Sequence, residues 1–140
     1  MRPTIIIAKT GLDGHDRGAV AVAEGLRSRG FQTHYTGIRR SPEEIAAAAA
    51  SLSADCVGVS SLSGAHLTAI PKVAEALRAA GWNGLLIAGG IIPEEDEPAL
   101  RAAGVCAVFR PHARIDDIAV FLRNSLEAAK HGALPGNDVG

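Results

Sequence analysis

Short apolar segments alternate with helical patterns five times along the chain. The expected strands are residues 4–8, 33–36, 55–60, 85–88 and 105–109. The second of these is the most polar, which is typical of an edge strand, whereas the first, third and fourth are almost wholly apolar, as strands covered on both faces are. Alternation of this kind predicts a parallel sheet flanked by helices.

The helices are indicated by their ends and by apolar positions at helical spacing. Ser41-Pro42-Glu43-Glu44 combines an N-cap serine, a proline at the first helical position and a glutamate three residues after the cap. Pro93, followed by three acidic residues, predicts the start of another helix, because acid is favoured at the positive end of the helix dipole. The apolar stripes expected to be buried are Ile45, Ala48, Ala49 and Leu52; Leu67, Ile70, Ala74 and Leu77; and Ile118, Phe121, Leu122 and Leu126.

These elements predict one α/β domain over residues 1–132, followed by a flexible tail over 133–140. The expected fold is flavodoxin-like and doubly wound, with a five-stranded parallel sheet of order 2-1-3-4-5. In that order the chain reverses direction between the first and third strands, and ligands bind there at the carboxyl ends of the strands. The loops of interest are those after Ala8, Ser60, Ala88 and Phe109.

Length and composition narrow the possible functions. A chain of 140 residues with 47% hydrophobic residues can form one core, and its net charge of −1 gives no attraction to nucleic acid or to an anionic membrane. The apolar run 5–7 is too short for a signal peptide or a membrane span. Cys56 and Cys106 lie in strand-like runs and are expected to be buried thiols rather than a disulfide framework or a zinc pair. We therefore expect a cytoplasmic protein.

The first loop, residues 9–18, contains the best candidate metal ligand. Asp13 and His15 lie two residues apart, so the carboxylate can hydrogen-bond one imidazole nitrogen and make the other a better metal donor. Lys9 could hold Asp13 ionised. The alternative is a polar turn with a solvated histidine, and this segment alone leaves both interpretations open.

The later loops add a hydroxyl and bare backbone. Ser60 ends the third strand, where it could contact a ligand or simply cap the next helix. Gly89-Gly90 ends the fourth strand, where paired glycines permit close approach of a ligand or form a flexible turn. A histidine, a hydroxyl and bare backbone on one rim suit a large flat cofactor. Three other kinds of site fit less well. A flavin site would need a first loop rich in Ser and Thr, and a phospho-receiver domain would need an aspartate at position 60. A zinc site would need three or four ligands, and the sequence offers one good candidate.

Three motifs resemble those of the cobalamin-binding domain of the methylmalonyl-CoA mutase group. They are Asp13-Gly14-His15-Asp16-Arg17-Gly18, then Ser60-Ser61-Leu62 after residues 19–59, then Gly89-Gly90 after residues 63–88. The resemblance extends along nearly the whole chain. Ala8-Lys9, His66-Leu67-Thr68 and Ile91-Ile92-Pro93 favour the acyl-CoA branch of that group, which includes 2-hydroxyisobutyryl-CoA mutase.

The resemblance implies that adenosylcobalamin binds base-off, with His15 as the lower axial ligand of cobalt. Asp13 would support His15 and Lys9 would support Asp13, so these three are the expected catalytic residues. The displaced base would enter a slot between the sheet and a helix. The implied cofactor-binding positions are Gly14, His15, Asp16, Arg17, Gly18, Ser60, Leu62, Gly64, Gly89, Gly90, Phe109 and Arg110. The chain departs from the family at Arg110-Pro111-His112-Ala113, where a Gly-Pro-Gly-Thr-like turn is common; Arg110 could reach the cofactor phosphate or be an ordinary surface arginine.

The resemblance also implies an activity and a partner. The chain would be the cobalamin-binding small subunit of an isomerase that rearranges acyl-CoA carbon skeletons by radical chemistry. A (β/α)₈ barrel needs roughly 250 residues, so a large TIM-barrel subunit that binds the acyl-CoA would be a separate chain. The alternatives are a free-standing corrinoid carrier for methyl transfer, a cobalamin sensor, or a flavodoxin-like module for another nucleotide. The identity of the acyl-CoA is not indicated by this chain.

Overall fold

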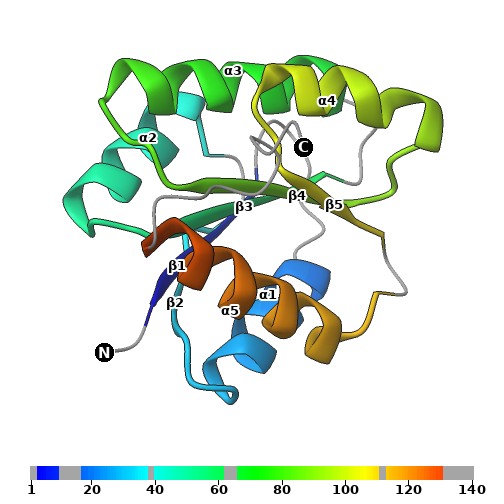
Figure 1. The fold of residues 1–140 in the computed structure, drawn as a ribbon. Helices are drawn as coiled ribbons and strands as arrows, with labels where there is room; N and C mark the ends of the chain where they lie inside the picture. Colours follow the sequence, from blue (N-terminus) through cyan, green and yellow to red (C-terminus); the bar gives the residue numbers. More distant parts are fainter. Residues whose placement is uncertain (1–2, 10–16, 38–39, 62–65, 111–112, 131–140) are drawn as a thin grey trace.

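The computed structural model describes residues 3–9, 17–37, 40–61, 66–110 and 113–130. Its five strands form one parallel sheet of order β2-β1-β3-β4-β5, which confirms the expected topology (Figure 1). The strands are β1 (Thr4–Lys9), β2 (Gln32–Tyr35), β3 (Cys56–Ser61), β4 (Leu85–Gly90) and β5 (Ala107–Phe109). The polar strand β2 lies at one edge, as its composition predicts.

Helices cover both faces of the sheet. The helices are α1 (Arg17–Arg27), α2 (Pro42–Ser51), α3 (His66–Ala79), the 3₁₀ turn η1 (Glu94–Asp96), α4 (Glu97–Ala103) and α5 (Ile115–Lys130). Figure 1 shows α2, α3 and α4 on one face and α1 with α5 on the other. Each face has its own buried apolar cluster, one including Val57 and Ile70 and the other including Ile5 and Leu122. The domain is therefore doubly wound, as parallel sheets buried on both faces require.

Helix α2 begins where its capping signal predicts. The Ser41 hydroxyl accepts a hydrogen bond from the Glu44 amide at 3.1 Å, and the Ser41 amide donates one to Glu44 Oε1 at 3.0 Å. This reciprocal pair is a capping box, and it lowers the pKa of the Glu44 carboxyl.

Two positions of the expected apolar stripes are wrong. Leu52 is 41% exposed because it is the C-cap of α2, past the last turn that faces the core. Leu67 is 46% exposed because it lies in the first turn of α3, at the rim of the sheet. The rest of these stripes is buried or half-buried, and Ala46 and Val73 join the buried set.

All five strands differ from the expected bounds by one or two residues, and the two-residue differences are at the end of β4 and the start of β5. Strand β4 extends through Gly89 and Gly90, because these residues pair in register with Ser60 and Ser61 of β3. Strand β5 begins only at Ala107, although Val105 is buried. Cys56 is fully buried as expected, whereas Cys106 is only half-buried before this edge strand.

Candidate functional site at the carboxyl edge of the sheet

Four of the predicted site residues lie in one row across the sheet. The Cα atom of Lys9 on β1 is in register with that of Ser60 on β3, Ser60 with Gly89 on β4, and Gly89 with Phe109 on β5. Because side chains alternate between faces along a strand, residues in one register row share a face. The neighbouring row that contains Ile7 and Ile87 belongs to the cluster under α1 and α5. Positions two residues further along each strand therefore face the same two helices.

A cleft of about 230 Å³ opens above this row, between the sheet and helices α1 and α5. Its sheet side includes Ser60, Gly89, Gly90 and Phe109, all predicted from the sequence. The described residues that line it are Ile7, Gly18, Ala19, Val22, Gly58, Val59, Ser60, Ile87, Ala88, Gly89, Gly90, Phe109, Arg110, Ala113 and Ile118. The lining is mainly apolar, and Ser60 and Arg110 are the residues with polar side chains among those described. An aromatic or similarly flat group with one polar edge suits such a cavity.

Glycines and small residues make the room for the cleft. Gly58 lies in the row between Ile7 and Ile87, and a Cβ atom there would come within 3.2 Å of Ile7 Cδ1 and 3.3 Å of Ile87 Cγ1. Gly58 lies outside the motifs at residues 13–18, 60–62 and 89–90, although a lone glycine inside an apolar strand is itself a sign of close approach. A Cβ atom on Gly18 would meet nothing within 4 Å, so this wall of the cleft is open at the start of α1.

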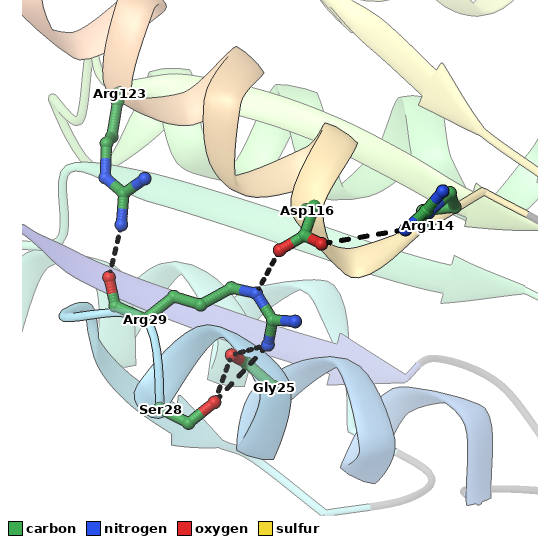
Figure 2. Close-up of polar contacts among 6 residues, drawn as sticks. All are labelled: Gly25, Ser28, Arg29, Arg114, Asp116 and Arg123. Atoms are coloured by element: carbon green, nitrogen blue, oxygen red, sulfur yellow. Dashed lines mark hydrogen bonds and ion pairs between the residues drawn. The ribbon is translucent and has the colours of Figure 1, made fainter.

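Contacts between the end of α1 and the first half of α5 hold the two helical walls of the cleft together. Arg29, just after α1, donates from Nε to Asp116 Oδ1 of α5 at 2.7 Å and from Nη1 to the Gly25 carbonyl at 2.8 Å (Figure 2). Arg123 of α5 donates to the Arg29 carbonyl. A Cβ atom on Gly25 would lie 2.8 Å from Ile115 Cγ2, so the helices approach closely at this point. These contacts fix the spacing of α1 and α5.

The Gly89-Gly90 pair has two different roles. Gly90 has φ +116°, a conformation that L-residues with a side chain rarely adopt. Gly89 has no such restriction, and a Cβ atom there would lie 3.4 Å from the Phe109 carbonyl oxygen. The first glycine thus leaves space in the cleft, and the second allows the chain to turn away from β4.

Arg110 lies at the end of the cleft next to β5 and is held by two partners. Its Nε donates to the Ile92 carbonyl at 3.2 Å, and its Nη2 donates to Glu97 Oε1 at 3.1 Å. Glu97 also pairs with Arg101 at 2.8 Å, and its carboxyl pKa is lowered by hydrogen bonds first to Arg101 and then to Arg110. Arg110 is therefore not a free surface arginine.

Lys9 is fully buried at the end of β1, which is unusual for a lysine. Its backbone carbonyl accepts a hydrogen bond from the Arg40 amide at 3.1 Å. Buried ammonium groups are retained in proteins when a partner offsets their desolvation. The position of Lys9 in the same row as Ser60 places a cationic residue beside the loop that it precedes.

Several predicted residues lie outside the described part of the chain. They are Asp13, Gly14, His15, Asp16, Leu62 and Gly64, and of Arg17 only the backbone, at the start of α1, is described. Within the described ranges, no cluster of three or more His, Cys, Asp or Glu side chains could hold a metal ion. None of the helices in those ranges combines the length and the hydrophobicity that a bilayer crossing requires.

Comparison with known proteins defines the class. The family model described as "B12 binding domain" matches residues 3–118. The chain belongs to this family of cobalamin-binding domains, and the motif resemblance is thereby confirmed.

The curated relatives of the chain include acyl-CoA mutases. The chain is 44% identical over 119 residues to the 2-hydroxyisobutanoyl-CoA mutase small subunit of Aquincola tertiaricarbonis, covering 81% of this chain and 88% of that protein. It is 47% identical over 106 residues to ethylmalonyl-CoA mutase of Cereibacter sphaeroides, covering 76% of this chain but only 16% of that protein. The chain thus spans most of a separate small subunit and a small part of a longer mutase.

A solved structure agrees on the fold. A cobalamin-binding protein from Desulfitobacterium hafniense superposes with a TM-score of 0.76 at 21% identity, covering 88% of this chain and 58% of that one. At this identity the likeness shows the fold alone.

Proposed function

We propose that this chain is the cofactor-binding subunit of an adenosylcobalamin-dependent acyl-CoA mutase. The observation that carries the proposal is the cleft over the row Lys9–Ser60–Gly89–Phe109, at the topological switch point of a B12-binding domain. The mutase assignment is supported by the 44% identity to a small subunit of similar length.

The described residues fit the nucleotide tail of a base-off cobalamin. The cleft is apolar, narrow between sheet and helices, and kept open by Gly18, Gly58 and Gly89. The Ser60 hydroxyl would hydrogen-bond the displaced base, and the Phe109 ring would contact it. This ring packs edge-to-face on Phe121, with 5.5 Å between the two ring centroids. A larger residue at any of the three glycines would occupy the space that the base needs.

His15 would hold cobalt from below, with Asp13 fixing the imidazole tautomer and Lys9 supporting the Asp13 carboxylate. The burial of Lys9 supports this arrangement, because a buried ammonium beside the first loop suits a carboxylate from that loop. Leu62 and Gly64, from the loop after β3, and Gly14, Asp16, Arg17 and Gly18, from the loop before α1, would contact the corrin or the tail.

Adenosylcobalamin supplies the radical chemistry when it is bound, and this chain places and supports it. The acyl-CoA and the reacting carbon atoms would be bound by a large TIM-barrel subunit. The chain covers only 16% of the longer ethylmalonyl-CoA mutase. This supports a division of labour in which a region outside the cobalamin-binding domain binds the acyl-CoA. The assembled enzyme would be a cytoplasmic isomerase.

The axial assignment is tested by electron paramagnetic resonance of the cob(II)alamin complex. The wild type should show nitrogen hyperfine coupling from the protein, and His15→Ala should lose it. His34→Ala, on edge strand β2, is the matched control and should retain it. Coupling that persists in His15→Ala would show that another ligand holds cobalt.

The mutase assignment is tested by mixing the chain with the candidate large subunit, adenosylcobalamin and a panel of acyl-CoA thioesters. Isomerisation that requires both chains supports the proposal. Base-off binding with no isomerisation, but with methyl transfer in the presence of a methyltransferase, would instead identify a corrinoid carrier. Binding without any turnover would favour a cobalamin sensor.

A further inference from the structure

Arg110 has a position that the family resemblance does not explain. It comes directly after β5, where the resemblance to the cobalamin-binding domain implies a Gly-Pro-Gly-Thr-like turn. In the structure it lines the cleft between the sheet and helices α1 and α5, and also the shallow depression formed by Glu94, Glu97, Pro98 and Arg101 on the α4 side. It therefore connects the two regions.

The Arg110 guanidinium is oriented before any ligand arrives. Nε is held by the Ile92 carbonyl and Nη2 by Glu97, and the side chain is only 27% exposed. Nη1 donates to no residue in the part of the chain that the structure describes. A planar guanidinium with some donors fixed and others available loses little entropy when it binds an oxyanion.

Arg110 gives the cleft lining its positive charge. Arg110 is the charged residue among the described residues that line the cleft. Glu97 is shared between Arg101 and Arg110, so its carboxylate is not devoted to Arg110 alone. Guanidinium groups bind phosphate oxygens through short charge-assisted hydrogen bonds.

We propose that Arg110 binds the phosphodiester of the cofactor's nucleotide tail, and that Glu97 and the Ile92 carbonyl position it to do so. The inference rests on the proposed function, since it requires the tail to enter this cleft. It assigns to Arg110 a contact with the tail at the turn where the resemblance implies a threonine.

The test uses corrinoids that differ in the phosphate. Dissociation constants are measured by absorbance titration of the full chain with cobalamin, cobinamide phosphate and cobinamide, which lacks both phosphate and base. Arg110→Met should weaken the affinity for cobalamin and for cobinamide phosphate by about 10-fold or more, the range expected for a lost charge-assisted hydrogen bond. The affinity for cobinamide should change by less than about twofold. Arg110→Lys should show an intermediate loss, because it keeps the charge without the oriented fork.

Arg101→Met is the matched control. Arg101 pairs with the same glutamate but does not line the cleft, so its loss should leave all three affinities unchanged. Thermal unfolding of each variant separates a binding effect from a folding effect. If Arg110→Met lost equal affinity for cobinamide and cobalamin, the role of Arg110 would be structural and the inference would be wrong. Unchanged affinity for both phosphate-bearing ligands would also overturn it. A wild type that binds none of the corrinoids would sink the proposed function itself.

Discussion

Arg29 and Asp116 join the two helices that wall the cleft. The Nε atom of Arg29, in the turn after α1, donates a 2.7 Å hydrogen bond to Oδ1 of Asp116 in the first turn of α5. Since residues of both helices line the cleft, this contact couples the stability of the fold to the width of the candidate site.

Asp116→Asn should lower the free energy of unfolding at neutral pH. The hydrogen bond and charge of Arg29 hold the pKa of Asp116 below its ordinary value of 3.8. Because the folded pKa is depressed, the contribution is full above the unfolded pKa and is lost as pH falls through the folded pKa. Urea unfolding should therefore show a modest gap between the variant and the wild type at neutral pH that closes in acid and shrinks in high salt.

Asp117→Asn is the control for Asp116. It removes an exposed acid from the same helical turn, and hence a similar interaction with the helix dipole, without breaking the Arg29 contact. Equal losses in the two variants would attribute the effect to the dipole rather than to Arg29.

Gly90→Ala should mainly lower the stability of the fold, whereas Gly89→Ala should mainly lower the affinity for corrinoid. Gly90 has φ +116°, so alanine there should destabilise the fold by about 1–3 kcal/mol. Alanine at position 89 makes only a 3.4 Å contact with the Phe109 carbonyl, so the fold should tolerate it while corrinoid affinity falls. Thermal unfolding and absorbance titration measure the two effects. Similar stability losses at both positions would contradict the division of roles.

Ser60→Leu should weaken cobalamin binding far more than it weakens the apo fold, because the new side chain would fill the cleft. Ser60→Ala keeps the cleft open and removes only the hydroxyl, so its affinity loss should be smaller, about 10-fold at most. Titration with cobalamin and urea unfolding of the apo protein provide the comparison. Parallel losses of binding and stability in Ser60→Leu would indicate a purely structural serine.

Cys56 and Cys106 should differ in reactivity towards iodoacetamide. Burial raises the pKa of the Cys56 thiol well above its ordinary value of 9.0, and that of the half-buried Cys106 to a lesser degree. Since the thiolate is the reactive form, Cys106 should be alkylated first and Cys56 only when the domain unfolds. Mass spectrometry of the wild type and of Cys106→Ser measures this order. Rapid labelling of folded Cys106→Ser would contradict the burial of Cys56.

The sequence alone determined the strand count, the edge position of β2 and the start of α2. These features follow from local physics: runs of apolar residues that must be covered on both faces, and a capping box whose members are three residues apart. The motifs at residues 13–18, 60–62 and 89–90 likewise indicated a cobalamin-binding domain, which the family comparison confirms.

Only the tertiary structure decided which of these residues meet. The register that aligns Lys9, Ser60, Gly89 and Phe109 depends on pairing between strands far apart in the chain, and no local pattern specifies it. The contribution of Gly58 to the cleft, the exposure of Leu67 at the rim and the Arg110–Glu97 contact likewise arise from packing between separate elements. Local spacing can propose such residues, but the space between a sheet and two helices exists only once all of them have folded together.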